Sequence, residues 1–311
     1  MSDPPSRSPL TREHAERLRA HGFAVVPDFL TGAELEAVRR DLPHLTPSAE
    51  EVRREPERYD NGQARSWFPF ESDALNDIVV RPDVIDWCAE AIGTANLVMT
   101  DALLLSKYGG LRDFDQPLHQ DFLNNDLAYP RRDGGFLQVT TILYLTDVGP
   151  DDGPTAVVDR ERYGQEVHQD LGHRAGGHPL YAYEVPVTCR AGTLFVYDTL
   201  TYHRGTSMSA PDGVRHVLFF QYGNAAHRWI GKHAYGHLGI APAMRRFMTR
   251  AAPRQREVIG FPPVGGDYWN EETLAGVARR YPEMDMAPYR EGMAARSRHE
   301  SASVAGTVPS G

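Results

Sequence analysis

Residues 192–205 read GTLFVYDTLTYHRG, a β-branched and aromatic run that ends at Asp198 and turns back before His203. Such a run, bounded by glycine and a turn, is typical of a buried strand. Similar runs occur at 97–108 (LVMTDALLLSKY), 136–148 (FLQVTTILYLTDV), 183–188 (YEVPVT) and 215–222 (RHVLFFQY). Because Gly, Pro, Asp or Asn separate these runs rather than regular helices, they favour an antiparallel sandwich or barrel over a βαβ sheet.

The first hundred residues predict helices with one strand inserted. A helix is expected over 12–20, followed by the strand Phe-Ala-Val-Val at 23–26. Thr31 with Glu34, and Ser48 with Glu51, form capping-box patterns that open two further helices. Pro82 stands at a first helical position, and Gly93 closes that helix. The plan is an α-rich N-terminal layer followed by a β core.

The ends of the chain differ from this core. Residues 1–9 and 291–311 are small, polar and aperiodic, which predicts disordered tails. Residues 10–225 are expected to form the core domain, and residues 226–290 a partly helical cover of the same domain. This cover contains aromatic residues that either border the substrate pocket or form scaffold or a homodimer interface, among them Trp229, Tyr235, Tyr268, Trp269 and Tyr289.

Composition excludes several classes of protein. The 311 residues are 41% hydrophobic and 24% charged, as in ordinary globular proteins, and the net charge of −9 gives no positive field for nucleic acid. No apolar run is long enough for a membrane helix or a signal core, so a cytoplasmic protein without a membrane partner is expected. The two cysteines, Cys88 and Cys189, cannot form a disulfide scaffold.

The 13 histidines are more informative. In the stretch Pro-Leu-His-Gln-Asp at 117–121, His119 and Asp121 are two residues apart, so an extended backbone points both to one face. His203, at the end of a distant strand, would complete the two-histidine, one-carboxylate triad of non-haem iron(II) oxygenases. Arg215 opens the next strand, and adjacent antiparallel strands would place its planar guanidinium near the metal, suited to a carboxylate.

The chain resembles the phytanoyl-CoA dioxygenase family of iron(II)- and 2-oxoglutarate-dependent oxygenases. The resemblance lies in PLHQD (117–121), LTDVGPDDGPTAVV (145–158), GTLFVYDTLTYHRG (192–205) with Arg215, and the opening HGFAVVPDFLTGAELEAVRRDL (21–42). It implies a mainly β fold with flanking helices, a double-stranded β-helix of the jelly-roll or cupin type. It also implies iron at His119, Asp121 and His203, and 2-oxoglutarate held by Arg215 and by the hydroxyl of Thr206.

One stretch departs from the family pattern. After the central glycine, members run on to a Pro-Gly-Ser-His turn, whereas this chain has Pro-Thr-Ala-Val-Val-Asp-Arg at 154–160. The missing residues do not bind iron in the family, but the neighbouring loop shapes the substrate pocket. The substrate is therefore less predictable than the metal.

Other readings of these residues compete with the triad. His168-Gln-Asp170 repeats the His119 triplet, but it lies in a glycine-rich stretch only 35 residues before His203 and is interpreted as a surface loop, with His173 and His178. Arg215 could instead pair with Asp212 or Asp198. His233 and His237 have the i, i+4 spacing of a helical zinc site, but glycines interrupt any helix there.

The predicted function is hydroxylation of a small organic molecule, such as a natural-product intermediate or an acyl thioester, with iron(II), 2-oxoglutarate and O₂. Related halogenases have Gly or Ala in place of the carboxylate, so Asp121 favours hydroxylation. Two alternatives stay open. The same triad serves desaturation, cyclisation or epoxidation, and a non-enzymatic metal-binding jelly roll would keep the fold without the chemistry.

Overall fold

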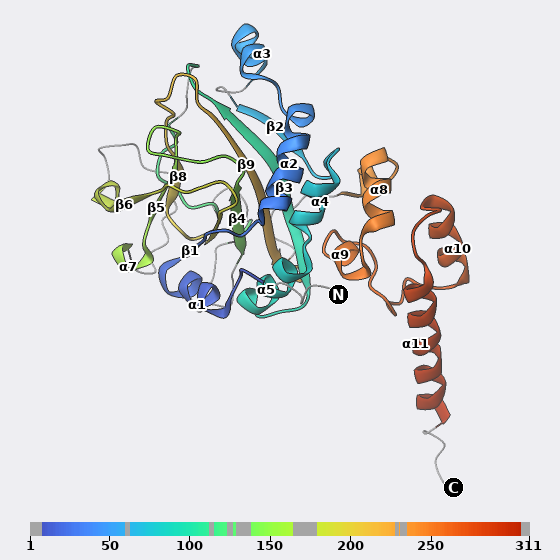
Figure 1. The fold of residues 1–311 in the computed structure, drawn as a ribbon. Helices are drawn as coiled ribbons and strands as arrows, with labels where there is room; N and C mark the ends of the chain where they lie inside the picture. Colours follow the sequence, from blue (N-terminus) through green and yellow to red (C-terminus); the bar gives the residue numbers. More distant parts are fainter. Residues whose placement is uncertain are drawn as a thin grey trace, which may run out of the picture. The chain divides into compact units, whose positions relative to one another are not determined.

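The computed structural model describes residues 8–59, 63–111, 115–122, 127–128, 138–163, 179–227, 230 and 235–305. These residues divide into two compact units, with the boundary between His233 and Ala234. The first unit contains all the strands of the described chain, and the second is helical (Figure 1). The cover expected from residue 226 therefore begins as a separate cluster at 234, and its packing on the first unit stays a prediction.

The strands are β1 (Phe23–Val26), β2 (Gln63–Trp67), β3 (Leu97–Tyr108), β4 (Val139–Tyr144), β5 (Thr155–Val158), β6 (Glu184–Val187), β7 (Leu194–Asp198), β8 (His203–Gly205) and β9 (Val214–Asn224). They form a six-stranded sheet in the order β1-β7-β4-β9-β3-β2 and a three-stranded sheet in the order β6-β5-β8. Every pairing is antiparallel. The fold is mainly β with flanking helices, as predicted, and the two sheets agree with a jelly roll.

The helices of the first unit are α1 (Arg12–His21), α2 (Gly32–Leu45), α3 (Ala49–Arg54), η1 (Pro56–Arg58), α4 (Asp73–Val79), α5 (Pro82–Ile92), α7 (Arg160–Tyr163) and η2 (Pro179–Tyr183). The predicted caps are present, since the hydroxyls of Thr31 and Ser48 accept from the third helical backbone N–H. Helices α4 and α5 lie against the outer face of the larger sheet (Figure 1), where the hydroxyl of Tyr222 on β9 donates to the carbonyl of Val79.

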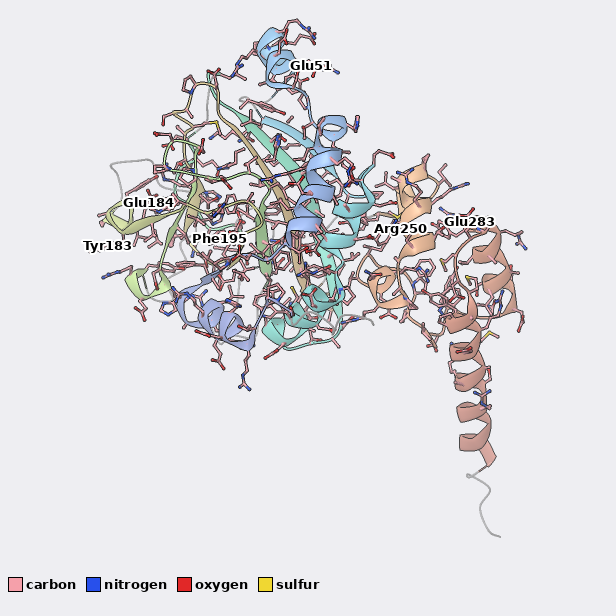
Figure 2. The ribbon with its side chains drawn as sticks, in the orientation of Figure 1. Glu51, Tyr183, Glu184, Phe195, Arg250 and Glu283 are labelled. Carbon is pink, nitrogen blue, oxygen red and sulfur yellow. The ribbon has the colours of Figure 1, made fainter. Side chains whose placement is uncertain are left out.

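Alternation along the strands divides the larger sheet into two faces. The outer face carries buried apolar side chains such as Leu104, Leu143 and Leu218, each of which contributes about 1.5–3 kcal/mol by burial. The inner face meets the smaller sheet in a cluster of Phe23, Tyr144, Val148, Val157, Val187, Phe195, Tyr197 and Val217. Figure 2 shows Phe195 among packed side chains, whereas Glu51 lies on the exposed helix α3. The inner face is where a site can be enclosed.

The second unit contains η3 (Tyr235–Leu238), α8 (Pro242–Arg250), α9 (Pro253–Glu257), α10 (Glu271–Arg280) and α11 (Ala287–Ala305). Its core is aromatic: Trp269 is fully buried, with Tyr289 and Phe261 at ring-centroid distances of 4.5 Å and 5.8 Å. The described residues include no helix long and apolar enough to cross a bilayer.

One prediction about the termini is wrong. Residues 291–311 were expected to form a disordered tail, yet α11 continues to Ala305. The stretch 287–305 contains five alanines, three arginines and two glutamates, which favour helix through intrinsic propensity without an apolar stripe. Residues 1–7 and 306–311 lie outside the described chain.

Candidate metal and cosubstrate site

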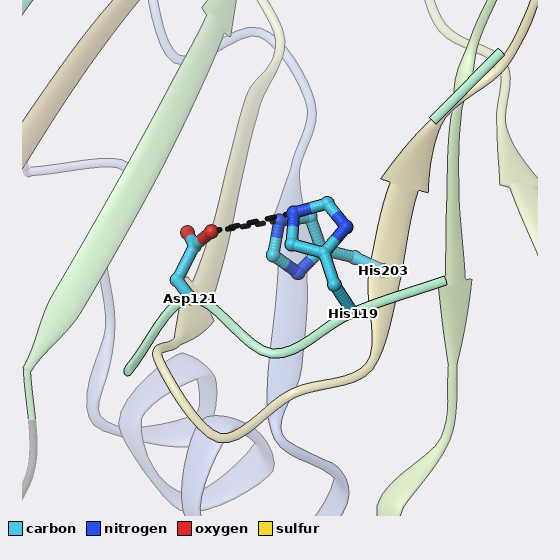
Figure 3. A group of neighbouring side chains, drawn as sticks. All are labelled: His119, Asp121 and His203. Atoms are coloured by element: carbon cyan, nitrogen blue, oxygen red, sulfur yellow. Dashed lines mark ion pairs between the residues drawn. The ribbon is translucent and has the colours of Figure 1, made fainter. Parts of the chain in front are cut away.

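Two segments far apart in sequence bring the histidines together. His119 and His203 exchange backbone hydrogen bonds, with N–O distances of 3.1 Å and 3.0 Å, in an isolated antiparallel bridge at the start of β8. Their rings are 4.6 Å apart between centroids. Asp121 follows two residues after His119 and points back to the same place (Figure 3). The predicted triad is therefore assembled by one backbone pairing.

Each imidazole is oriented by a backbone carbonyl. His119 Nδ1 lies 2.8 Å from the carbonyl oxygen of Pro117, and His203 Nδ1 lies 2.9 Å from that of Thr201. A carbonyl only accepts, so each Nδ1 carries a proton, and in the neutral ring each Nε2 keeps its lone pair. Both Nε2 atoms lie 3.5 Å from Asp121 Oδ1. Dashed lines mark these two ion pairs in Figure 3. Three lone-pair donors thus face one point.

The charge states suit a cation. Burial would raise the pKa of Asp121, but the two imidazoles and the Tyr197 hydroxyl lower it to about 2. Burial lowers the pKa of His203 to about 4. Burial also lowers the pKa of His119, but the Asp121 carboxylate outweighs this and raises it overall. Near neutral pH the carboxylate is therefore ionised and the His203 imidazole is neutral, the forms that ligate metals.

The residues fit a divalent transition metal. The three donor atoms lie within 4.8 Å of one another. A metal about 2.1 Å from each of three ligands on one octahedral face needs donors roughly 3 Å apart, close to the 3.5 Å between each Nε2 and Asp121 Oδ1. Two imidazoles and one carboxylate on one face are the donor set of non-haem iron(II) sites.

Arg215 lines the same cavity, although β8 and β9 belong to different sheets. The expectation that His203 and Arg215 lie on adjacent antiparallel strands is therefore wrong, because β8 pairs with β5 and Arg215 arrives from the facing sheet. The Arg215 guanidinium donates to the carbonyl of Gly153. Gly153 has φ +63°, which glycine adopts without strain.

The alternative partners of Arg215 are engaged elsewhere. Asp212 pairs with Arg53 at 3.0 Å, and Asp198 pairs with Arg160. Neither carboxylate therefore explains the position of Arg215.

Lys107 on β3 is directly opposite Arg215 on β9, lines the same cavity and is 1% exposed. Its ammonium donates to the carbonyl of Thr206 at 2.7 Å. Like charges opposite each other on neighbouring strands repel. An anion bound between Lys107 and Arg215 would be attracted to both side chains. Lys107 was missed from the sequence, although its side chain points to the same face of β3 as Leu103 and Leu105, which also line the cavity.

Thr206 does not line the cavity. Its hydroxyl donates to the carbonyl of Pro154 at 2.7 Å, and its backbone N–H donates to the same oxygen. In this structure it ties two loops together, and its contact with a cosubstrate stays a prediction.

The cavity has a volume of about 520 Å³ and lies between the two sheets. Its lining residues in the described chain all fall between 63 and 221. Trp269 is fully buried among aromatic residues of the second unit, and Tyr289 and Phe261 surround it. His168, Asp170, His173, His178, Trp229 and His233 lie outside the described residues, and so does the side chain of His237.

The two facing antiparallel sheets, with two histidines and a carboxylate in the cavity between them, define a non-haem metal-dependent oxygenase. The family model described as "Phytanoyl-CoA dioxygenase (PhyH)" matches residues 18–217, and the chain belongs to this family. It is accordingly an enzyme that uses iron and 2-oxoglutarate. No protein of curated function matches the sequence.

Solved structures share the fold at low sequence identity. The carbocyclase SnoK from nogalamycin biosynthesis has a TM-score of 0.51 and 21% identity, covering 74% of this chain and 90% of its own. The epimerase SnoN, solved with Fe³⁺, α-ketoglutarate and nogalamycin RO, has a TM-score of 0.50 and 18% identity, and the match covers 68% of this chain and 83% of SnoN. HygX from Streptomyces hygroscopicus, solved with nickel and 2-oxoglutarate, has a TM-score of 0.51 and 18% identity, and the match covers 72% of this chain and 96% of HygX.

Proposed function

We propose that the protein hydroxylates a small organic molecule, with His119, Asp121 and His203 as the iron ligands and Arg215 and Lys107 as the anchor of 2-oxoglutarate. The observation that carries the proposal is the convergence of two Nε2 atoms on Asp121 Oδ1 in a cavity that Arg215 and Lys107 also line. When bound, iron with 2-oxoglutarate supplies the oxidation of the substrate by O₂, coupled to release of succinate and carbon dioxide.

The residues of the chain have separate tasks in this reaction. The triad would hold the metal through three protein ligands and would leave its remaining coordination positions to cosubstrate and O₂. Arg215 offers a planar fork and Lys107 a point charge, which together hold the far carboxylate of 2-oxoglutarate. The sheets exclude bulk water, since His203 and Arg215 are only 5% and 6% exposed.

Hydroxylation is proposed because Asp121 fills the third protein position, which halide-binding relatives leave open. A second outcome, ring closure or another oxidation without oxygen transfer, uses the same triad. SnoK is described as a carbocyclase and SnoN as an epimerase, so the family fold supports such outcomes. Mass spectrometry of the product separates them, because hydroxylation adds one oxygen atom and ring closure removes two hydrogens.

The experiment for the proposed function is 2-oxoglutarate turnover by the iron-loaded protein. Succinate release that requires iron and O₂, and that Asp121→Ala abolishes, is the expected result. Succinate release unaffected by Asp121→Ala would overturn the proposal, as would the absence of 2-oxoglutarate binding. The second result would favour the non-enzymatic metal-binding alternative.

A further inference from the structure

The end of the cavity away from Arg215 has a different chemistry. Asp101 on β3 and Gln221 on β9 are cross-strand partners, and both line the cavity. Gln221 is six residues along β9 from Arg215, which is about 20 Å of extended chain. The cationic pair and this carboxylate–amide pair therefore mark opposite ends of one cavity.

A bulge in β3 builds this second end. The register between β3 and β9 shifts between Met99 and Asp101, so Thr100 is the extra residue. Thr100 and Asp101 both line the cavity, whereas a regular strand would point them to opposite faces. Bulges of this kind re-aim side chains and are frequent next to active sites.

Hydrogen bonds hold Gln221 in place. The Thr100 hydroxyl donates to Gln221 Oε1 at 2.8 Å, and Gln221 Nε2 donates to the Thr140 hydroxyl at 2.9 Å. The amide nitrogen has a second hydrogen that these two bonds do not use. A fixed amide donor thus lies beside the Asp101 carboxylate, which only accepts when it is ionised.

This end is in register with the metal site. The Tyr197 hydroxyl on β7 donates to the metal ligand Asp121. Across the larger sheet, Tyr197 pairs with Thr140 on β4, and Thr140 pairs with Gln221 on β9. Gln221 in turn pairs with Asp101 on β3. Three strand spacings separate Tyr197 from Asp101, about 14 Å between backbones. After the side chains are allowed for, the space suits a compact ring compound with one end at the metal.

On β3, β4 and β9 the wall between the two ends is apolar. Leu103 is opposite Phe219 and Leu105 is opposite Val217, while Ile142 lines the same wall from β4. Such a wall suits the hydrocarbon face of a ring. Arg65 on β2 pairs with Leu105. Its guanidinium donates to Gln63 Oε1 at 2.7 Å, and Gln63 pairs with Lys107, so this hydrogen bond lies on the side of the cationic end. A phosphate or carboxylate group placed beside the Asp101 carboxylate is repelled by it, so this contact does not suit the phosphates of a coenzyme A thioester.

We propose that Asp101, with Gln221 and Thr100, binds a hydrogen-bond-donating group of the substrate, and that the substrate is a compact ring compound bearing amino or hydroxyl groups. The inference rests on the proposed function, because it places this substrate in the oxygenase cavity. Asp101 is a specificity-determining residue in this scheme and has no role in holding iron or 2-oxoglutarate.

The test compares three sets of probes: aminocyclitols, monosaccharides and acyl-CoA thioesters. Succinate formation by the iron enzyme reports coupling, and saturation-transfer NMR with the inert zinc-substituted protein reports binding without turnover. We expect a compound of the first or second set to bind and to stimulate succinate formation. Asp101→Leu then weakens its binding and its coupled kcat/KM about 10- to 100-fold, the range for loss of a hydrogen bond to a charged group.

Asp101→Asn distinguishes the two donors. It loses the charge but keeps an acceptor, so an amine-bearing compound loses as much affinity as with Asp101→Leu, whereas a hydroxyl-bearing compound loses only a few-fold. Both results support the proposal. Asp86→Asn on the exposed face of α5 is the matched control and leaves coupling unchanged.

Three results would overturn the proposal: stimulation by an acyl thioester, full coupling in Asp101→Leu, or no binding by any aminocyclitol or monosaccharide. The wild-type protein without probes tests the proposed function separately. A lack of 2-oxoglutarate binding there would contradict the oxygenase activity itself, whatever Asp101 does.

Discussion

The Tyr197 hydroxyl donates to Asp121 Oδ2 at 3.0 Å, while Asp121 Oδ1 faces both imidazoles. The tyrosine is fully buried, and its ring lies 4.4 Å from that of His203. One carboxylate oxygen is therefore held by the protein, and the other is left for the metal. Tyr197 is a positioning residue, because it acts on the metal through Asp121.

Tyr197→Phe keeps the ring and removes only the hydroxyl. We expect the affinity for divalent metal to fall about 10- to 100-fold, the usual effect of losing an outer-shell partner of a metal ligand. Calorimetric titration with nickel measures this. Tyr222→Phe, which loses a buried hydrogen bond to the Val79 carbonyl on the opposite face of the sheet, is the matched control. Equal metal affinity in both variants would refute the positioning role.

Arg215→Lys retains the charge and loses the planar fork. We expect the affinity for 2-oxoglutarate to fall at least about 10-fold, as for loss of a charge-assisted hydrogen bond, while nickel still binds. Titration of 2-oxoglutarate into the nickel-loaded protein measures both. Arg53→Lys, whose partner is the exposed Asp212, leaves this affinity at the wild-type value. An unchanged affinity in Arg215→Lys would remove Arg215 from the cosubstrate site.

The imidazole of His216 is expected to make the free energy of unfolding depend on pH in the acidic range. Its Nδ1 lies 2.7 Å from the Ser106 hydroxyl, and burial lowers its pKa from 6.5 to about 4. Between these values the unfolded chain binds more protons than the folded chain, so stability falls as the pH falls from 6.5 to 4. The contribution is at most about 3 kcal/mol.

His216→Asn should therefore give a flatter dependence of unfolding free energy on pH than the wild type, measured by urea denaturation between pH 7 and about 4.5. His44→Asn on the exposed part of α2 should keep the wild-type slope. Identical slopes in all three proteins would show that His216 does not contribute.

We expect Trp269 to stabilise the second unit as part of its aromatic core. Replacing it with Ala removes a fully buried ring that Phe261 and Tyr289 contact, at a cost of about 3–5 kcal/mol. Hydrogen exchange of peptides from 242–296 should become markedly faster. Tyr268→Ala, at a site that is 47% exposed, should change exchange much less. Unaltered exchange in Trp269→Ala would contradict the aromatic core.

Local patterns in the sequence predict the strands and the triad because each depends on short-range information. Runs of β-branched and aromatic residues placed β3, β7 and β9, and the two-residue spacing of His119 and Asp121 placed them on one face. Strand β8 has only three residues, His203–Gly205, too few to form such a run. Its pairing with β5 rather than β9 depends on long-range contacts that assign β8 to the smaller sheet. Short sequence patterns carry no information about these contacts.

The residues that were missed are polar side chains inside strands. Lys107 and Asp101 share the inward parity of β3, but a charged residue in a strand is more often exposed to solvent. The bulge at Thr100 decides which side chains face the cavity, and it appears only when β3 is paired with β9. Helix α11 was missed because its residues favour helix individually but show no apolar period.

The most direct test is a structure of crystals grown without oxygen, with iron(II) and 2-oxoglutarate, in which anomalous scattering locates the metal. We predict one metal about 2.0–2.2 Å from His119 Nε2, His203 Nε2 and Asp121 Oδ1, and the far carboxylate of 2-oxoglutarate on Arg215 and Lys107. A metal bound by other residues, or 2-oxoglutarate bound away from Arg215, would contradict this prediction.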